Sequence, residues 1–139
     1  MAKLPTDLQI LEEIYKRYYT VFASFTKDSP NRSSKVHVPI DVREIADRLK
    51  IDGDIVFGRL YYHFNQRYGF TETDGVKVHF FLLQVGQDKH VVQFPLLASV
   101  LAELREEHTK HLRGLALSVA AIVISFASLL FSILYRGAH

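Results

Sequence analysis

The sequence contains no cysteine and no tryptophan. The absence of cysteine excludes both a disulfide framework and a thiolate zinc site, and it fits a domain that faces the reducing cytoplasm. The first ten residues, MAKLPTDLQI, have no apolar run of the kind that a signal peptide needs, so we expect no cleaved leader. The sequence also has no Gly-rich phosphate loop, no GxSxG and no HExxH. We therefore expect neither an enzyme nor a bound cofactor.

Charge is absent from residues 115–135, which read LALSVAAIVISFASLLFSILY and contain neither proline nor glycine. A helix of this length spans about 30 Å, the thickness of the hydrocarbon core of a bilayer. Arg113 and Arg136 bracket the stretch, so we expect a single transmembrane helix over residues 114–136. Lys110 and Arg113 precede this span, whereas only Arg136 follows it, and this asymmetry favours a cytoplasmic N-terminal domain.

An excess of positive charge is missing from the part of the chain before the span. Of the 17 Lys and Arg residues, only Arg113 and Arg136 lie beyond residue 111, so the preceding part carries 15 basic and 15 acidic residues. Binding to nucleic acid depends largely on excess positive charge. This balance therefore weakens any argument for DNA binding.

The N-terminal half of the soluble part reads as three helices and a short strand. Thr6 caps a first helix with Gln9 at the capping-box position, and the helix ends near Phe25. Its apolar residues recur at helical spacing: Leu8, Leu11, Ile14, Tyr15, Tyr18, Val21, Phe22 and Phe25. Residues 35–40 predict a brief strand. Asp41 caps a second helix with Glu44 at the capping-box position, and a third helix follows over residues 54–68 with Gly69 as its C-cap.

The remaining soluble residues read as a hairpin and a long helix. Residues 76–85 and 90–94 are rich in β-formers and are separated by a loop at 86–89. Pro95 suits the first turn of a helix. We expect one long helix, or two in line, from Pro95 into the membrane, with residues 95–113 as its juxtamembrane part and residues 137–139 as a short tail.

This order of elements resembles the winged helix-turn-helix superfamily. The helix-turn-helix unit corresponds to residues 41–64, which contain the pattern Ile45-Ala46-x-x-Leu49, and the wing corresponds to residues 76–94. The expected fold is α+β: a winged-helix domain over residues 1–94, followed by the long helix. The layout also resembles membrane-tethered transcription regulators, but their sensor domain normally lies beyond the membrane, where this chain has only four residues.

The resemblance implies that the third helix and the wing carry the binding residues. At 100° per residue, one face of this helix is apolar and forms the core side: Phe57, Leu60, Tyr61, Phe64 and Tyr68. The candidate residues for binding DNA or a protein partner lie on the other side or near the wing turn: Arg59, Tyr62, His63, Gln66, Arg67 and Lys89. Asp52 and Asp54 precede the helix and would repel DNA, and an exposed polar face is also an ordinary solvated surface.

Small and hydroxyl residues form a stripe on one side of the predicted span: Ser118, Ala121, Ser125, Ser128 and Ser132. Such stripes let membrane helices approach closely and form hydrogen bonds with each other, so we expect self-association into a homo-oligomer. Serine can instead satisfy its hydroxyl on its own helix backbone.

The seven histidines suggest a metal site, but their surroundings do not support one. His108 and His111 are three residues apart on one helix, yet no carboxylate or cysteine set completes a site, and Lys110 adds positive charge. We expect a solvated surface near the membrane and no bound metal.

Two functions follow as hypotheses. In the first, the chain is a membrane-tethered regulatory or interaction module that acts through the third helix and wing, on DNA or on a cytoplasmic protein. This hypothesis predicts that Arg59→Ala or Gln66→Ala weakens binding with little loss of stability. In the second, the chain is a small oligomeric membrane effector, and the span is the active part. That hypothesis predicts that Ser125→Leu with Ser128→Leu abolishes activity.

Overall fold

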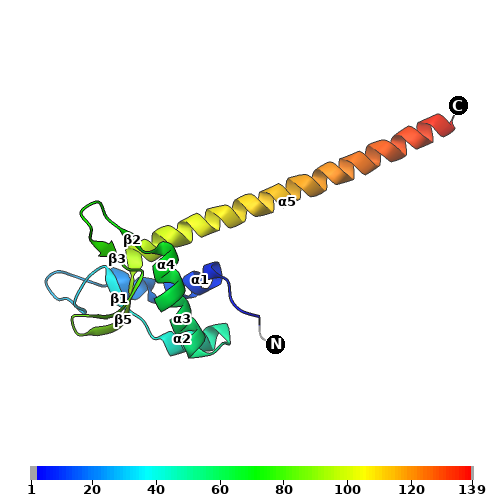
Figure 1. Cartoon of the computed structure of the whole chain (residues 1–139). Helices are drawn as coiled ribbons and strands as arrows, with labels where there is room; N and C mark the ends of the chain where they lie inside the picture. Colours follow the sequence, from blue (N-terminus) through cyan, green and yellow to red (C-terminus); the bar gives the residue numbers. More distant parts are fainter. Residues whose placement is uncertain (1–2, 139) are drawn as a thin grey trace. The chain divides into compact units, whose positions relative to one another are not determined.

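The structure is a computed structural model that describes residues 3–138. The chain forms two compact units, Met1–Ala102 and Glu103–His139 (Figure 1). The first unit is an α+β fold with a small antiparallel sheet, and the second is the greater part of a long C-terminal helix. The α+β class and the long C-terminal helix confirm the coarse prediction from the sequence.

The first helix, α1, extends over Asp7–Ala23 and has the predicted capping box. The backbone N–H of Gln9 donates to Thr6 Oγ1 at 3.2 Å, and the backbone N–H of Thr6 donates to Gln9 Oε1 at 2.8 Å. The helix ends before the predicted Phe25, and its fully buried residues lie in the N-terminal half: Ile10, Leu11 and Ile14. Ile10 was missing from the predicted apolar face, whereas Val21, which was on it, is exposed.

Arg32 closes the C-terminal end of α1 from the following loop. Its guanidinium donates to the carbonyl oxygens of Val21 and Phe22 at 2.9 and 3.1 Å, and to those of Ser34 and Lys35 at 3.1 and 2.6 Å. The last carbonyls of a helix lack their usual N–H partners within the helix. The Val21 carbonyl oxygen also accepts from the Ser24 hydroxyl at 2.7 Å, and Arg32 adds a charged donor there and at Phe22. Its burial, with 8% exposed, was not predicted, because the sequence identifies this segment only as a loop.

The second helix, α2, extends over Val42–Leu49 and is capped by Asp41, whose Oδ1 accepts from the backbone N–H of Glu44 at 3.1 Å. In a complete capping box the Glu44 side chain would also accept a hydrogen bond from the Asp41 backbone N–H. Here both of these groups contact α1. The Glu44 carboxylate pairs with Arg17, and the backbone N–H of Asp41 donates to the Tyr18 hydroxyl at 2.7 Å. These contacts attach the start of α2 to α1.

The third helix consists of three contiguous segments: α3 (Gly53–Gly58), the π-helix η1 (Arg59–Phe64) and α4 (Asn65–Tyr68). We refer to the three together as the third helix. The turn before it depends on Lys50, which adopts the left-handed conformation with φ 59°. The predicted helix over residues 54–68 therefore exists, but its middle is π-helical.

Gly69 is the C-cap of the third helix, as predicted, and its backbone is extended, with φ −66° and ψ 155°. Glycine is required there by space. A Cβ at this position would lie 2.4 Å from the Asn65 carbonyl oxygen and 3.1 Å from the Val78 carbonyl oxygen.

The main sheet has three antiparallel strands in the order β1-β5-β4: β1 is His37–Pro39, β4 is Phe81–Val85 and β5 is Asp88–Gln93. The hairpin of β4 and β5 was predicted. The predicted strand over residues 76–85 is interrupted, because β3 (Lys77–Val78) pairs with β2 (Phe70–Thr71) in a separate two-stranded hairpin.

The last helix, α5, extends over Phe94–Gly137 without a break at Gly114, in agreement with the predicted long helix. The Phe94 ring stacks on Tyr15 and Phe22, with centroid distances of 5.5 and 4.8 Å. Other residues from the first turns of α5 are also buried in the core: Leu97, Val100 and Leu101. The first unit therefore includes the start of α5.

The second unit contains the apolar part of α5. Its most apolar 18-residue window has a mean hydropathy of 2.5, and none of that window is buried. This helix is long and apolar enough to cross a membrane.

Candidate interaction surface on the third helix

The core face of the third helix is defined by residues spaced four apart: Val56, Leu60 and Phe64. A π-helix has i→i+5 hydrogen bonds, so its turn is wider than that of an α-helix, and residues four apart stay closer to one face. The prediction assumed 100° per residue throughout. It correctly placed Leu60 and Phe64 in the core, but it omitted Val56.

Three further residues of the third helix lie beside the core. Phe57, Tyr61 and Tyr68 are only half-buried, although all three were predicted to be core residues. The Phe57 and Tyr61 rings stack on each other at a centroid distance of 5.6 Å. Turns of π-helix are rare in proteins, but those that exist are frequently found at functional sites. The outer face of this helix is therefore a candidate interaction surface.

Asn65 attaches the third helix to the edge strand β4. Its side-chain amide accepts from the Phe81 backbone N–H at 2.8 Å and donates to the Phe81 carbonyl oxygen at 2.9 Å. It also donates to the Tyr61 carbonyl oxygen at 2.9 Å. One side chain thereby pairs both backbone groups of a strand residue, as a neighbouring strand would. Nothing in the sequence pattern distinguishes this asparagine from a surface residue.

On the outer face, Arg59 is not free for a partner. Its guanidinium donates to the carboxylate of Asp7, at the start of α1, and to the Pro5 carbonyl oxygen at 2.9 Å. The Arg59 side chain is 23% exposed. We therefore now expect Arg59→Ala to lower stability as well, because the substitution removes interactions that attach α1 to the third helix.

His63 and Arg67 converge on the same carboxylate. Asp7 Oδ2 lies 2.9 Å from Arg67 Nη1 and 3.4 Å from His63 Nε2, and it accepts from the Tyr68 hydroxyl at 2.7 Å. Together with Arg59, these side chains form what we call the Asp7 cluster. Three of the six predicted binding residues thus belong to one cluster, around an acid that the sequence marks only as a first-turn residue.

The environment of Asp7 favours its charged form. Burial alone would raise the pKa of this carboxyl group, but hydrogen bonds from Tyr68 and Arg59 and the positive charges of Arg59 and His63 outweigh that effect. The pKa of Asp7 is consequently below its ordinary value. Asp7 itself is 11% exposed, whereas Arg67 and His63 are 54% and 45% exposed.

The other three predicted binding residues lie outside the Asp7 cluster and are exposed. Tyr62, at 69% exposure, and Gln66 lie on the third helix, and Lys89 lies on β5 opposite Gln84 of β4. Ile55 adds an exposed apolar side chain to the same helix. Asp52 caps α3 by accepting from the Asp54 backbone N–H at 2.8 Å, so an acidic pair does lie at the start of this helix.

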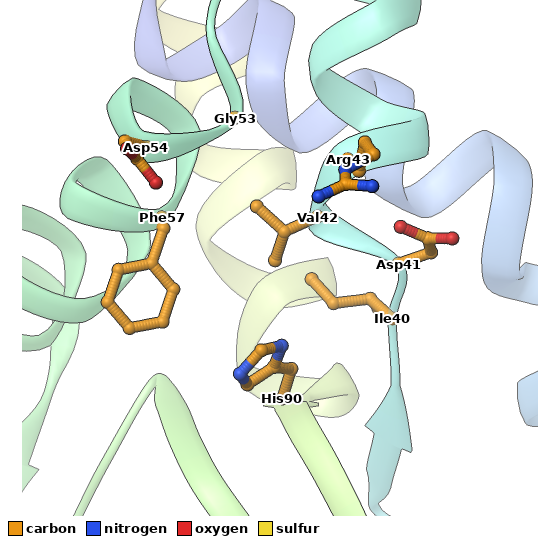
Figure 2. A pocket seen from close by; sticks show the side chains of 8 residues that line it. All are labelled: Ile40, Asp41, Val42, Arg43, Gly53, Asp54, Phe57 and His90. Atoms are coloured by element: carbon orange, nitrogen blue, oxygen red, sulfur yellow. The ribbon is translucent and has the colours of Figure 1, made fainter.

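An open cleft of about 490 Å³ lies where α2 and α3 begin. Figure 2 shows Asp41 and Arg43 on one side of it, Asp54 and Phe57 across from them, and His90 at one end. The His90 backbone has a positive φ of 54°, and its ring lies 5.7 Å from the Phe57 ring. Charges of both signs line this cleft, so it has no clear preference for an anion or a cation.

Among residues 3–138, no group of three or more His, Cys, Asp or Glu side chains is placed to hold a metal ion. In α5, the hydroxyls of Ser118 and Ser125 donate to the carbonyl oxygens of Gly114 and Ala121, each at 2.9 Å. At least these two serines of the predicted stripe are satisfied within their own helix.

Comparison of the chain with models of protein families, with curated proteins and with solved structures finds no match. The function is therefore inferred from the geometry and charge of the chain alone.

Proposed function

We propose that this chain is a membrane-anchored interaction module, in which a cytoplasmic winged-helix domain is held at the bilayer by the apolar part of α5. The domain acts through the exposed face of the third helix and the β4–β5 hairpin. The module is regulatory or scaffolding in nature and not an enzyme. Its first candidate partner is a cytoplasmic protein.

The observation that carries this proposal is the exposure of the apolar window of α5. None of that window is buried, although its mean hydropathy is 2.5. Soluble monomers rarely leave continuous apolar surfaces of this size in water, whereas a lipid bilayer covers such a surface at no cost in unpaired backbone groups. A membrane therefore accounts for both the length and the composition of the helix.

The winged-helix assignment is supported by the order and pairing of the elements. One helix, a short strand, a second helix and the third helix follow each other. The β2–β3 hairpin comes next, and then the β4–β5 hairpin, whose strand β5 pairs with β1. Apart from the β2–β3 hairpin, which was not predicted, this is the order that suggested the superfamily from the sequence. Fold does not determine function, so the partner has to be argued from the surface.

The surface favours a protein partner over DNA. Arg59 is paired with Asp7, and the soluble part carries no excess of positive charge. DNA remains a second candidate, because Tyr62, Gln66 and Lys89 are exposed and are chemically able to contact bases and phosphates.

The rival proposal, an oligomeric membrane effector, is supported by the stripe of small residues in α5. The two proposals respond differently to substitution. Ser125→Leu with Ser128→Leu should abolish an activity that resides in the span, with Val123→Leu as the matched control on another face. The same pair of substitutions should leave binding by the cytoplasmic domain unchanged.

The test uses the full chain in nanodiscs as bait for cytoplasmic proteins and, separately, as a binder of duplex DNA over a salt series. Tyr62→Ala and Gln66→Ala should each abolish binding of a specific protein partner without lowering thermal stability. The control Lys16→Ala, on the exposed side of α1, should leave that binding unchanged. If the chain binds DNA, and this binding weakens steeply with salt and is lost in the same two variants, the partner is nucleic acid and not protein. Retention of all binding by both variants would rule out the third helix as the interacting face.

A further inference from the structure

The Asp7 cluster has the composition of an anion-binding site that is occupied by the chain's own carboxylate. Four side chains of the third helix provide the donors, and Asp7 provides two oxygens. Arg59 binds Oδ1, whereas Arg67, His63 and the Tyr68 hydroxyl surround Oδ2. Two hydrogen bonds and a neighbouring imidazole on one oxygen are more than a helix-to-helix ion pair requires.

The charges in this cluster do not cancel. Arg59 and Arg67 carry two positive charges, and His63 adds a third when it is protonated, whereas Asp7 supplies a single negative charge. A phosphomonoester carries about −1.5 to −2 at neutral pH and three strong acceptor oxygens. A phosphodiester carries only one negative charge, which gives it no advantage in charge over Asp7.

The cluster is open on the side where an external anion would enter. Arg67 and His63 are about half exposed, while the Asp7 carboxylate lies beneath them at 11% exposure. Asp7 is the first residue of α1, and residues 3, 4 and 6 beside it are exposed. The site is vacated if this one short side chain, in the first helical turn, rotates away from the third helix.

We propose that Arg59, His63, Arg67 and Tyr68 form a binding site for a phosphomonoester group, which Asp7 occupies until such a ligand takes its place. This inference rests on the proposed function in one respect, namely that the third helix is the interacting face. Asp7 then acts as a built-in competitor, which keeps the affinity for free phosphate low and reserves the site for a phosphorylated partner that makes further contacts.

The test measures whether phosphate restores what the loss of Asp7 removes. The full chain in detergent micelles is prepared as wild type, Asp7→Asn, Asp7→Asn with Arg67→Ala, and the control Asp47→Asn, which removes an exposed acid of α2. Melting temperatures are recorded in phosphate and in chloride of equal ionic strength. Phosphate should raise the melting temperature of Asp7→Asn by about 5 °C and those of the other three by much less.

Equal changes in the melting temperatures of all four proteins in phosphate would contradict the proposed binding site. Because Asp7→Asn could fail to fold, a second measurement uses the wild type. The imidazole NMR signals of His63 should shift on titration with inorganic phosphate and with a phosphotyrosine peptide. Absence of a shift with both would also overturn the proposal.

Two further outcomes separate the possible ligands. A larger response to the phosphopeptide than to free phosphate would assign the site to a protein partner. A response to duplex DNA alone would overturn the monoester assignment. If phosphate has no effect while Tyr62→Ala still abolishes partner binding, the phosphate site is wrong and the interaction module stands.

Discussion

The carboxylate of Asp7 accepts a hydrogen bond from the guanidinium of Arg59, 52 positions along the chain. This contact joins the first turn of α1 to the π-helical part of the third helix, and it places a negative charge against a face that is otherwise basic. The pair therefore affects both the stability of the domain and the charge that it presents to a partner.

Asp7→Asn should lower the free energy of unfolding at neutral pH by about 2–3 kcal/mol, because the variant leaves partly buried cations without their counter-charge. The pKa of Asp7 is below its ordinary value of 3.8 in the folded state. Its contribution is thus complete above that value and is lost as pH falls through the lower, folded pKa. Urea unfolding between pH 2 and 7 should show a constant difference from wild type near neutrality that narrows in acid. A difference independent of pH would contradict this assignment.

Arg32→Lys should destabilise the domain nearly as much as Arg32→Ala, by about 2–3 kcal/mol. The guanidinium reaches four backbone carbonyls at once, and a single ammonium group cannot reproduce that fork. Chemical denaturation measures the loss, with Arg43→Lys, at an exposed position of α2, as the control. Full stability in Arg32→Lys would mean that charge alone is needed.

Gly69→Ala should destabilise the fold by about 1–3 kcal/mol, because its Cβ would overlap the Asn65 carbonyl oxygen. Gly53→Ala is the matched control. A Cβ at Gly53 meets nothing within 4 Å, and its φ is not positive, so this change should be neutral or stabilising by about 0.5–1 kcal/mol. Thermal unfolding of both variants decides the point, and similar losses in the two would show that the close approach at Gly69 is unimportant.

Asn65→Asp tests the attachment of the third helix to β4. A carboxylate still accepts from the Phe81 backbone N–H, but it cannot donate to the carbonyl oxygens of Phe81 and Tyr61. We expect a loss of about 2 kcal/mol or more at neutral pH. Hydrogen exchange should show faster opening of β4, whereas Gln66→Glu, at the next position, should leave β4 unchanged.

The sequence predicts those parts of the fold that depend on local chemistry. Thr6 with Gln9 and Asp41 with Glu44 mark two helix starts, and the apolar window of α5 marks a possible span. The mean period of apolar residues also locates the third helix to within about a residue. These features depend on neighbours in the chain, so one sequence contains enough information to find them.

The remaining features depend on contacts between distant residues. Asp7 and Arg67 are 60 positions apart, and Asn65 and Phe81 are 16 apart, so no spacing rule connects them. The π-helical turn changes which residues of the third helix face the core, and a fixed period cannot detect it. Arg59 was expected on a free face but contacts Asp7, because this contact joins residues that are 52 positions apart.

The central claim is that the apolar part of α5 lies in a membrane and holds the folded domain there. Its most direct test is extraction of cell membranes with alkaline carbonate, with the full chain compared with a variant carrying Val123→Lys and Leu130→Lys. Two lysines in the middle of the span should prevent stable insertion. The wild type should remain in the membrane pellet and the variant should be released. Release of the wild type by carbonate would contradict the account.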